Sequence, residues 1–302
     1  MASNPSSTPL CIPPNSRSNL TYDLHAHSIA SDGEFSPERL VELAQRAGVD
    51  VLALTDHDTV AGIETAIGAA QDLSAEAETA INVLPGVEIS SRWSGVDIHI
   101  VGLHIRYKDE KLLERLAKQA EKRFARASAI DRKLAKLGIE GVLEEVQAKV
   151  GAKVPGRPDF AKVLIERGIC RNFDEVFRKY LGQGKAAYAM IEWPSVEETV
   201  AWITEAGGSA VLAHPARYKL TRTKLSRLIA AFQAAGGAAI EVATPGLDKG
   251  KIDQLANFAE EYRLMSSAGS DYHGSAMPWV QLGRYPPLPK RCTPIWSLWT
   301  TE

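Results

Sequence analysis

Two histidines lie one residue apart directly after a short apolar run, and an aspartate follows them at residue 32. Residues i and i+2 of a strand point to the same side, so His25 and His27 can present both imidazoles to one point. Neutral imidazoles that converge beside a carboxylate are ligands that divalent metal ions take in proteins. Alone, the pair is equally compatible with two partly exposed histidines at a strand end, so the rest of the chain must supply partners.

Most of the other histidines occupy similar places in the chain. His57, His214 and His273 each lie at or just beyond the end of an apolar run, and His99 lies within another. Because the C-termini of the strands share one face of an α/β barrel, we expect these side chains and the neighbouring acids to gather there. The candidate metal-ligating group comprises six histidines (His25, His27, His57, His99, His214 and His273) with three or four of the nearby acids, among them Asp32, Glu88 and Asp271.

This donor set is too large for one ion and suits two or three divalent ions that share a bridging carboxylate. Mixed imidazole and carboxylate ligation is compatible with Zn, Mn or Fe and argues against Mg alone, which prefers oxygen ligands. Glu88 lies in an apolar run, where a buried acid needs a partner, although an outward-facing place on an edge strand stays open. Asp58 is predicted to cap a helix that starts at Thr59, and His104 is predicted to be incidental.

Strands and helices alternate at both ends of the chain, which indicates a mostly parallel sheet or an α/β barrel. Ser36 is predicted to be the N-cap of a helix, with Pro37 at its first position and Gly48 at its end. Strands are predicted at residues 21–25, 50–55, 81–84, 86–90, 96–102, 209–213, 238–242 and 264–268.

Residues 106–193 contain several helical segments and no predicted strand. We therefore predict an all-α lobe inserted into a barrel made of residues 20–105 and 194–302. Most charges of the long helical stretch at residues 109–137 are expected to form a solvated face. The Ser-, Pro- and Asn-rich residues 1–19 are predicted to be a disordered lead-in.

Composition excludes several classes of function. The formal net charge is −2, so no global basic field favours binding to duplex DNA. The three cysteines are far apart and form no C-x-x-C pair, which suits a reducing cytoplasm better than a disulfide framework. No apolar run is long enough for a membrane span. The oligomeric state is left open.

The order of the candidate ligands resembles the PHP family (polymerase and histidinol phosphatase). The matching motifs are His25-Ala26-His27 with Ser31-Asp32-Gly33, Thr55-Asp56-His57-Asp58, Gly86-Val87-Glu88, His99-Ile100-Val101-Gly102, Ala213-His214-Pro215 and Gly269-Ser270-Asp271-Tyr272-His273. This resemblance implies an α/β fold, a distorted (β/α)7 barrel, with a trinuclear metal centre. By the resemblance, one ion is held by His25, His27, Glu88 and Asp271, a second by Glu88, His99 and His214, and a third by Asp32, His57 and His273.

The predicted lobe narrows the resemblance to a bacterial subgroup that removes phosphate from nucleoside 3',5'-bisphosphates and degrades short RNA from the 5' end. The similar segments are residues 157–161 and 177–185. Arg157, Lys185 and Arg217 are expected to clamp the substrate phosphates. The subgroup usually has a histidine where this chain has Asp159, so Asp159 is expected to shift substrate preference or pH optimum.

The expected reaction is hydrolysis of a phosphate ester by a hydroxide between the first two ions, held by Glu88 with Asp271 and His214. Mn is the expected metal, with Zn or Fe as alternatives, and the lobe is expected to act as a lid over a nucleotide or short RNA. Three alternatives stay open. The substrate could be a cyclic or other small phosphate ester, the enzyme could be a processive exonuclease, or the barrel could be a non-catalytic, metal-stabilised binding module.

Overall fold

The computed structural model describes residues 20–76, 80–151 and 153–299, so the predicted lead-in at residues 1–19 lies outside the described residues. Seven strands form one sheet in chain order. The first and last strands meet, since Ala26 forms a parallel bridge with Tyr272. The predicted distorted α/β barrel is therefore confirmed. Its strands are β1 (Tyr22–Ala26), β2 (Val51–Leu54), β3 (Asn82–Trp93), β4 (Val96–Leu103), β5 (Ser209–Leu212), β6 (Ala239–Ala243) and β7 (Met265–Ala268).

Strand β4 runs against the direction of the others. It pairs in antiparallel fashion with both β3 and β5, whereas the remaining neighbours within the sheet are parallel. An antiparallel strand begins where its parallel neighbours end. His99, which lies opposite Ser90 of β3, is therefore brought to the carboxyl end of the barrel although it lies in the first half of its own strand.

Strand β3 is one continuous strand, so the prediction of separate strands at residues 81–84 and 86–90 is wrong. The Pro85-Gly86 pair is typical of a break, but here it marks a change of partner. Strand β2 pairs with residues up to Pro85, and β4 pairs from Gly86 onward. Glycine is required at residue 86, because an added Cβ would lie 2.8 Å from the side chain of Thr55. The continuous strand carries Glu88 into the barrel.

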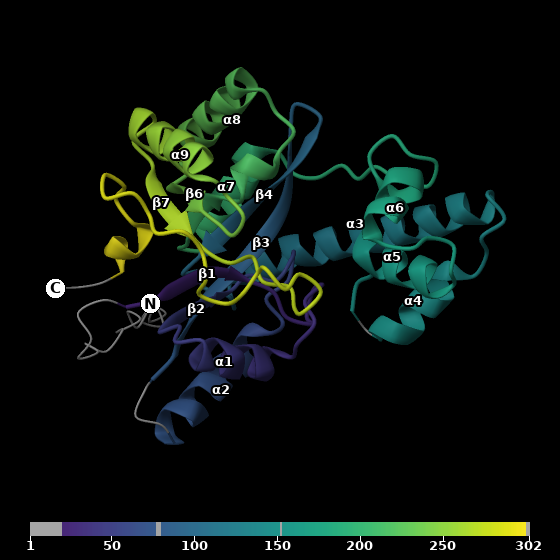
Figure 1. Ribbon diagram of the computed structural model, residues 1–302, viewed down its shortest axis with the longest axis horizontal. Helices are drawn as coiled ribbons and strands as arrows, with labels where there is room; N and C mark the ends of the chain where they lie inside the picture. The colour runs from purple at the N-terminus through teal and green to yellow at the C-terminus, as the bar shows by residue number, and fades with distance from the viewer. Residues whose placement is uncertain (1–19, 77–79, 152, 300–302) are drawn as a thin grey trace, which may run out of the picture.

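Five helices flank the barrel (Figure 1): α1 (Pro37–Arg46), α2 (Ile63–Glu76), α7 (Val196–Glu205), α8 (Arg222–Ala234) and α9 (Lys249–Glu261). As predicted, Ser36 caps α1, and Pro37 occupies its first turn. Helix α2 begins at Ile63 rather than Thr59, so the prediction that Asp58 caps it is wrong. The physical reason is that Asp58 has a left-handed backbone (φ 50°), and its carboxylate accepts a hydrogen bond from the N–H of Ser90 on β3 instead.

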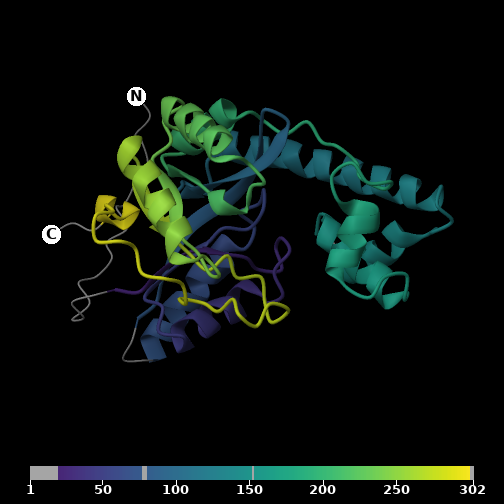
Figure 2. The ribbon, with the colours of Figure 1, turned by 45° about the horizontal axis from the view of Figure 1, so that its top comes forward.

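An all-helical lobe lies at the far end of the long helix α3 (Glu110–Ala135), beside the barrel (Figures 1 and 2). Ile130 and Leu134 of α3 share a separate apolar core with Val146, Phe160 and Leu164. The exact division of the chain at residues 106 and 193 stays a prediction. None of the described helices combines the length and the apolar character that crossing a membrane requires. The lobe also contains α4 (Val142–Val150), α5 (Arg157–Glu166), α6 (Phe173–Val176) and the π-helical turn η1 (Phe177–Leu181).

Candidate metal centre

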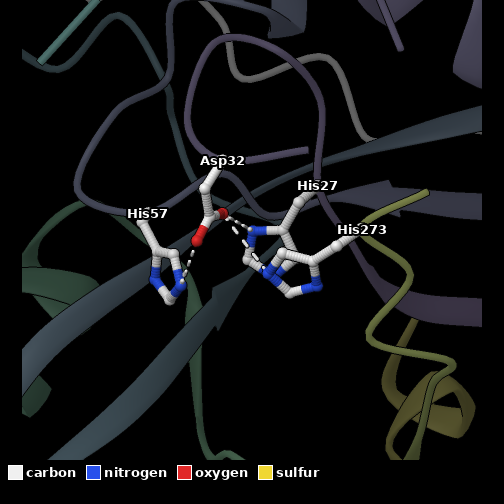
Figure 3. A group of neighbouring side chains, drawn as sticks. All are labelled: His27, Asp32, His57 and His273. Carbon is white, nitrogen blue, oxygen red and sulfur yellow. Dashed lines mark ion pairs between the residues drawn. The ribbon is translucent and has the colours of Figure 1, made fainter. Parts of the chain in front are cut away.

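Four side chains from three loops point toward one another at the carboxyl end of the barrel (Figure 3). His27 and Asp32 lie in the loop after β1, His57 follows β2, and His273 follows β7. Asp32 Oδ1 lies 3.3 Å from His273 Nε2 and 3.8 Å from His27 Nδ1, and Asp32 Oδ2 lies 3.7 Å from His57 Nε2. One donor atom from each residue falls within 4.8 Å of the others, which is close enough for a shared metal ion.

A second group lies deeper in the barrel and contains His25, His27, Glu88 and Asp271, all of them buried. Glu88 Oε2 lies 3.2 Å from His25 Nε2 and 3.3 Å from His27 Nε2. Asp271 Oδ1 lies 3.4 Å and 3.2 Å from the same two nitrogens. Two imidazoles and two carboxylates thus face one small volume, and they are the four residues that the resemblance assigned to one ion.

Glu88 lies between the groups. Its Oε1 is 2.9 Å from His99 Nδ1 and 3.0 Å from His214 Nε2. Its Oε2 also approaches His57 Nδ1, at 3.1 Å. His57, Glu88 and His99 therefore form a third group of potential ligands. His57 faces Asp32, as the resemblance implied, and also Glu88, a contact that the resemblance did not imply.

The donor atoms fit metal ions because several of them are buried and have no other partner. His25 Nε2, His27 Nε2, His57 Nδ1, Glu88 Oε2 and Asp271 Oδ1 are buried without a hydrogen bond to any described residue. Leaving such atoms unpaired is costly. Imidazole nitrogens that face carboxylate oxygens at 3.1–3.4 Å without donating to them are arranged as ligands around a cation. The residues present therefore fit divalent ions.

The electrostatics of the centre also favour cations. Burial opposes ionisation of Glu88, but the imidazoles of His57 and His25 outweigh it and hold the pKa of Glu88 well below its ordinary value. The pKa values of Asp32 and Asp271 are lowered well below normal in the same way, with burial opposed by neighbouring imidazoles. All three carboxylates are therefore ionised near neutral pH and available as ligands.

Glu241 is a part of the centre that the sequence-based prediction missed. It is 1% exposed, and its Oε1 lies 2.7 Å from His25 Nδ1. Its other oxygen accepts a hydrogen bond from the backbone N–H of His214. A carboxylate that takes the Nδ1–H of an imidazole fixes the tautomer and leaves Nε2 free to bind a metal. A signal was available, since Glu241 is an acid within an apolar run, as Glu88 is.

Replacing Glu241 with Gln is expected to weaken metal binding about 10- to 100-fold, since the amide cannot hold both His25 and the backbone of His214 as an anion does. Metal content after dialysis against buffered Mn2+ would measure the loss. Glu261→Gln, at the exposed end of helix α9, is the matched control and should leave the content unchanged. Equal metal affinity in wild type and Glu241→Gln would contradict this role.

A cavity of about 760 Å3 lies between the metal centre and the lobe. Asp32, His57 and His99 line it on the barrel side. On the lobe side it is lined by Arg123, Arg126, Lys153, Arg157, Asp159, Phe177 and Trp193. The expectation that the charges of residues 109–137 form a solvated face therefore fails for Arg123 and Arg126, which α3 directs into the cavity.

The predicted substrate-binding residues are placed differently from one another. Arg157 lines the cavity and stacks over the ring of Phe177. Asp159 also lines it, but its carboxylate caps α5 by accepting from the N–H of Gly156 at 2.8 Å. Arg217 forms an ion pair with Asp271. Lys185 is exposed after η1 and, like Arg217, is not among the residues that line the cavity, so its contact with substrate stays a prediction.

Buried imidazoles and carboxylates that converge at the carboxyl ends of barrel strands define the active site of a metal-dependent enzyme. Residues 23–194 match the model of the PHP domain. The chain therefore belongs to the PHP family, as the motifs predicted, and it is a metal-dependent phosphoesterase.

Two curated relatives and one solved structure resemble nearly the whole chain. The 5'-3' exoribonuclease Rnm of Escherichia coli is 42% identical, with 93% of this chain and 94% of the relative covered. The 3',5'-nucleoside bisphosphate phosphatase of Chromobacterium violaceum is 38% identical, over 91% and 94%. The structure of an amidohydrolase from Chromobacterium violaceum, with bound sulfate and no metal, has a TM-score of 0.85 and 37% identity, over 92% of this chain and 95% of that one.

Proposed function

We propose that the protein removes phosphate from nucleoside 3',5'-bisphosphates such as 3'-phosphoadenosine 5'-phosphate, and that it degrades short 5'-phosphorylated RNA. The relatives named above act, by their names, on substrates of these two kinds. The observation that carries the proposal is the cavity, which has metal-ligating side chains on one wall and cationic side chains on the other. A substrate with two separated phosphates matches both walls at once.

The lobe side of the cavity, here called the cationic wall, is lined by Arg123, Arg126, Lys153 and Arg157. Part of its positive charge has no ion-pair partner among the described residues. Arg126 is only 8% exposed and makes no ion pair with any described carboxylate. Burial, and then repulsion by Arg123 and Arg157, lower the pKa of Arg126 to about 9, so it is still protonated at neutral pH. Arg157 also lacks a described ion-pair partner. Both guanidinium groups lie over aromatic rings, but a buried guanidinium without an ion pair is costly, and a phosphate in the cavity would supply the missing anion.

We further propose three divalent ions, Mn first and Zn or Fe as alternatives. His25, His27, Glu88 and Asp271 would hold one, Glu88, His99 and His214 the second, and Asp32, His57 and His273 the third. Such ions lower the pKa of bound water and neutralise charge on the phosphoryl group. The protein side chains hold these ligands in place, since Glu241 and the backbone orient the imidazoles.

The lobe forms the cationic wall of the cavity in which the reaction would take place. Arg126 and Arg157 would bind the phosphate remote from the metals, and Arg217 beside Asp271 would face the phosphate at the centre. A wall that covers the reacting ester limits the access of bulk water. A cytoplasmic location, where nucleotides and RNA turn over, is part of the proposal.

Purified protein with Mn2+ is expected to release phosphate from 3'-phosphoadenosine 5'-phosphate, and a chelator should lower the rate by at least about 100-fold. Adding Mn2+ back should restore it. The measurement is phosphate release across mononucleotides, bisphosphates, cyclic nucleotides, and short RNA of graded length with a 5'-phosphate or a 5'-hydroxyl. Preference for a cyclic nucleotide would contradict the bisphosphate proposal. Bound metal without turnover of any ester would favour the binding-module alternative.

A further inference from the structure

Asp58 occupies an unusual place beside the metal centre. It follows His57 directly, has a left-handed backbone with φ 50°, and is 4% exposed. A non-glycine residue adopts this conformation at a cost and needs surrounding contacts to hold it. Its backbone N–H donates to the carbonyl of Glu88 at 2.9 Å. The backbone therefore turns the Asp58 side chain away from the metal-ligating groups and toward helix α3.

The carboxylate of Asp58 binds Arg123 of α3. Oδ2 accepts from Arg123 Nε at 2.7 Å and lies 2.6 Å from Nη2, while Oδ1 accepts from the N–H of Ser90 at 2.8 Å. Arg123 Nη2 also donates to Ser90 Oγ at 2.7 Å. The buried amide of Gln119, one turn earlier on α3, donates to the carbonyl of Ser90 at 3.0 Å. Helix α3, which leads into the lobe, is thus hydrogen-bonded to the barrel at Asp58 and Ser90, both of which line the cavity.

One edge of the Arg123 guanidinium has no partner among the described residues. Nε and Nη2 are used by Asp58 and Ser90, whereas Nη1 donates to no other described residue. The guanidinium lies 5.2 Å from the ring of Trp193, which limits its rotation. Arg123, Asp58 and Ser90 all line the cavity. The group is therefore oriented by the protein on one side and left free on the other, as a preorganised anion-binding group would be.

We propose that Asp58 is a positioning residue for substrate binding, which orients Arg123 so that its Nη1 edge binds the substrate phosphate remote from the metal ions. The inference rests on the proposed function and deepens it. Asp58 itself does not touch substrate. It links the loop that carries His57 to helix α3, which leads into the lobe. It therefore sets the distance between the metal-ligating side chains and the cationic side chains on the two sides of the cavity.

The substitution Asp58→Asn keeps the shape of the side chain but replaces a charged acceptor with an amide. Oδ1 and Oδ2 both accept hydrogen bonds in the native protein. An amide has only one oxygen, so its NH2 group must face either the N–H of Ser90 or the donors of Arg123. Arg123 would lose its orientation while the metal ligands keep their places.

With the adenosine bisphosphate as substrate, we expect Asp58→Asn to raise KM about tenfold while kcat changes less than about threefold. The rise should be at least about five times larger than that for p-nitrophenyl phosphate, which has one phosphate. Because the two residues act as a unit, Asp58→Asn with Arg123→Gln should raise KM no more than Arg123→Gln alone. The binding of adenosine 5'-phosphate, measured by calorimetry, should weaken in parallel.

Glu205→Gln is the control. Glu205, at the end of α7, pairs at 2.7 Å with Arg115 of α3, the helix that also carries Arg123, but it lies outside the cavity. It should leave both constants unchanged. The inference is overturned if Asp58→Asn keeps the wild-type KM and dissociation constant, or if its effect adds fully to that of Arg123→Gln. A wild-type protein that binds adenosine 5'-phosphate but hydrolyses no ester would instead contradict the proposed function and leave the calorimetric comparison to decide the role of Asp58.

Discussion

Replacing Glu88 with Gln is expected to lower kcat/KM by at least about 1000-fold, the scale expected when metal-ion catalysis is lost. Glu88 is fully buried, and its two oxygens contact five imidazoles at 2.9–3.3 Å, so no other carboxylate can replace it. The amide has no negative charge, and its NH2 group must face nitrogens that need a cation or an acceptor. Metal binding and turnover should therefore fail together.

Metal content by elemental analysis and phosphate release would be measured on the same Glu88→Gln sample. Glu121→Gln on an exposed position of α3 is the matched control and should behave as wild type. Restoring turnover with excess Mn2+ would mean that Glu88 affects affinity alone. Full metal content with normal turnover would contradict the place of Glu88 at the centre.

The sequence predicted that the candidate histidines and acids gather at one end of the barrel because its signals are local. Each candidate ligand follows or interrupts an apolar run, and the barrel gathers the ends of such runs. The structure brings His99 close to Glu88, although the reversal of β4 that does so depends on pairing between strands. Glu241 was missed because the rule applied to Glu88, that a buried acid needs a partner, was not applied to β6.

The cationic wall was harder to predict because it depends on which way α3 faces. Gln119, Arg123 and Arg126 follow the same helical spacing as the buried Leu116 and Ile130, so polar side chains stand within the apolar stripe of the helix. That pattern was a usable signal, whereas counting charges along residues 109–137 suggested a solvated face. The contact of Lys185 with substrate stays a prediction from its motif, since Lys185 is exposed and lies outside the residues that line the cavity.

Replacing Arg126 with Met is expected to stabilise the protein and weaken substrate binding at the same time. The substitution keeps most of the volume and removes a guanidinium that is 8% exposed, lies 5.5 Å over the ring of Trp193 and makes no ion pair with a described residue. Burying an uncompensated charge is unfavourable, so its loss should raise the free energy of unfolding by about 1–2 kcal/mol and Tm by about 2–4 °C. Without that charge, the KM for the bisphosphate should rise about 30-fold.

A matched arginine in the same lobe separates this effect from a general loss of charge. Arg167 donates to the Glu145 carboxylate and to the carbonyl of Glu140, outside the cavity. Arg167→Met should therefore lower Tm and leave KM unchanged, the opposite of Arg126→Met on both measures. Thermal unfolding of the ligand-free protein and steady-state kinetics would give the two signs. A lower Tm for Arg126→Met would mean that the charge of Arg126 is already compensated without substrate. Arg126 would then need no phosphate as a partner, which would contradict its proposed role.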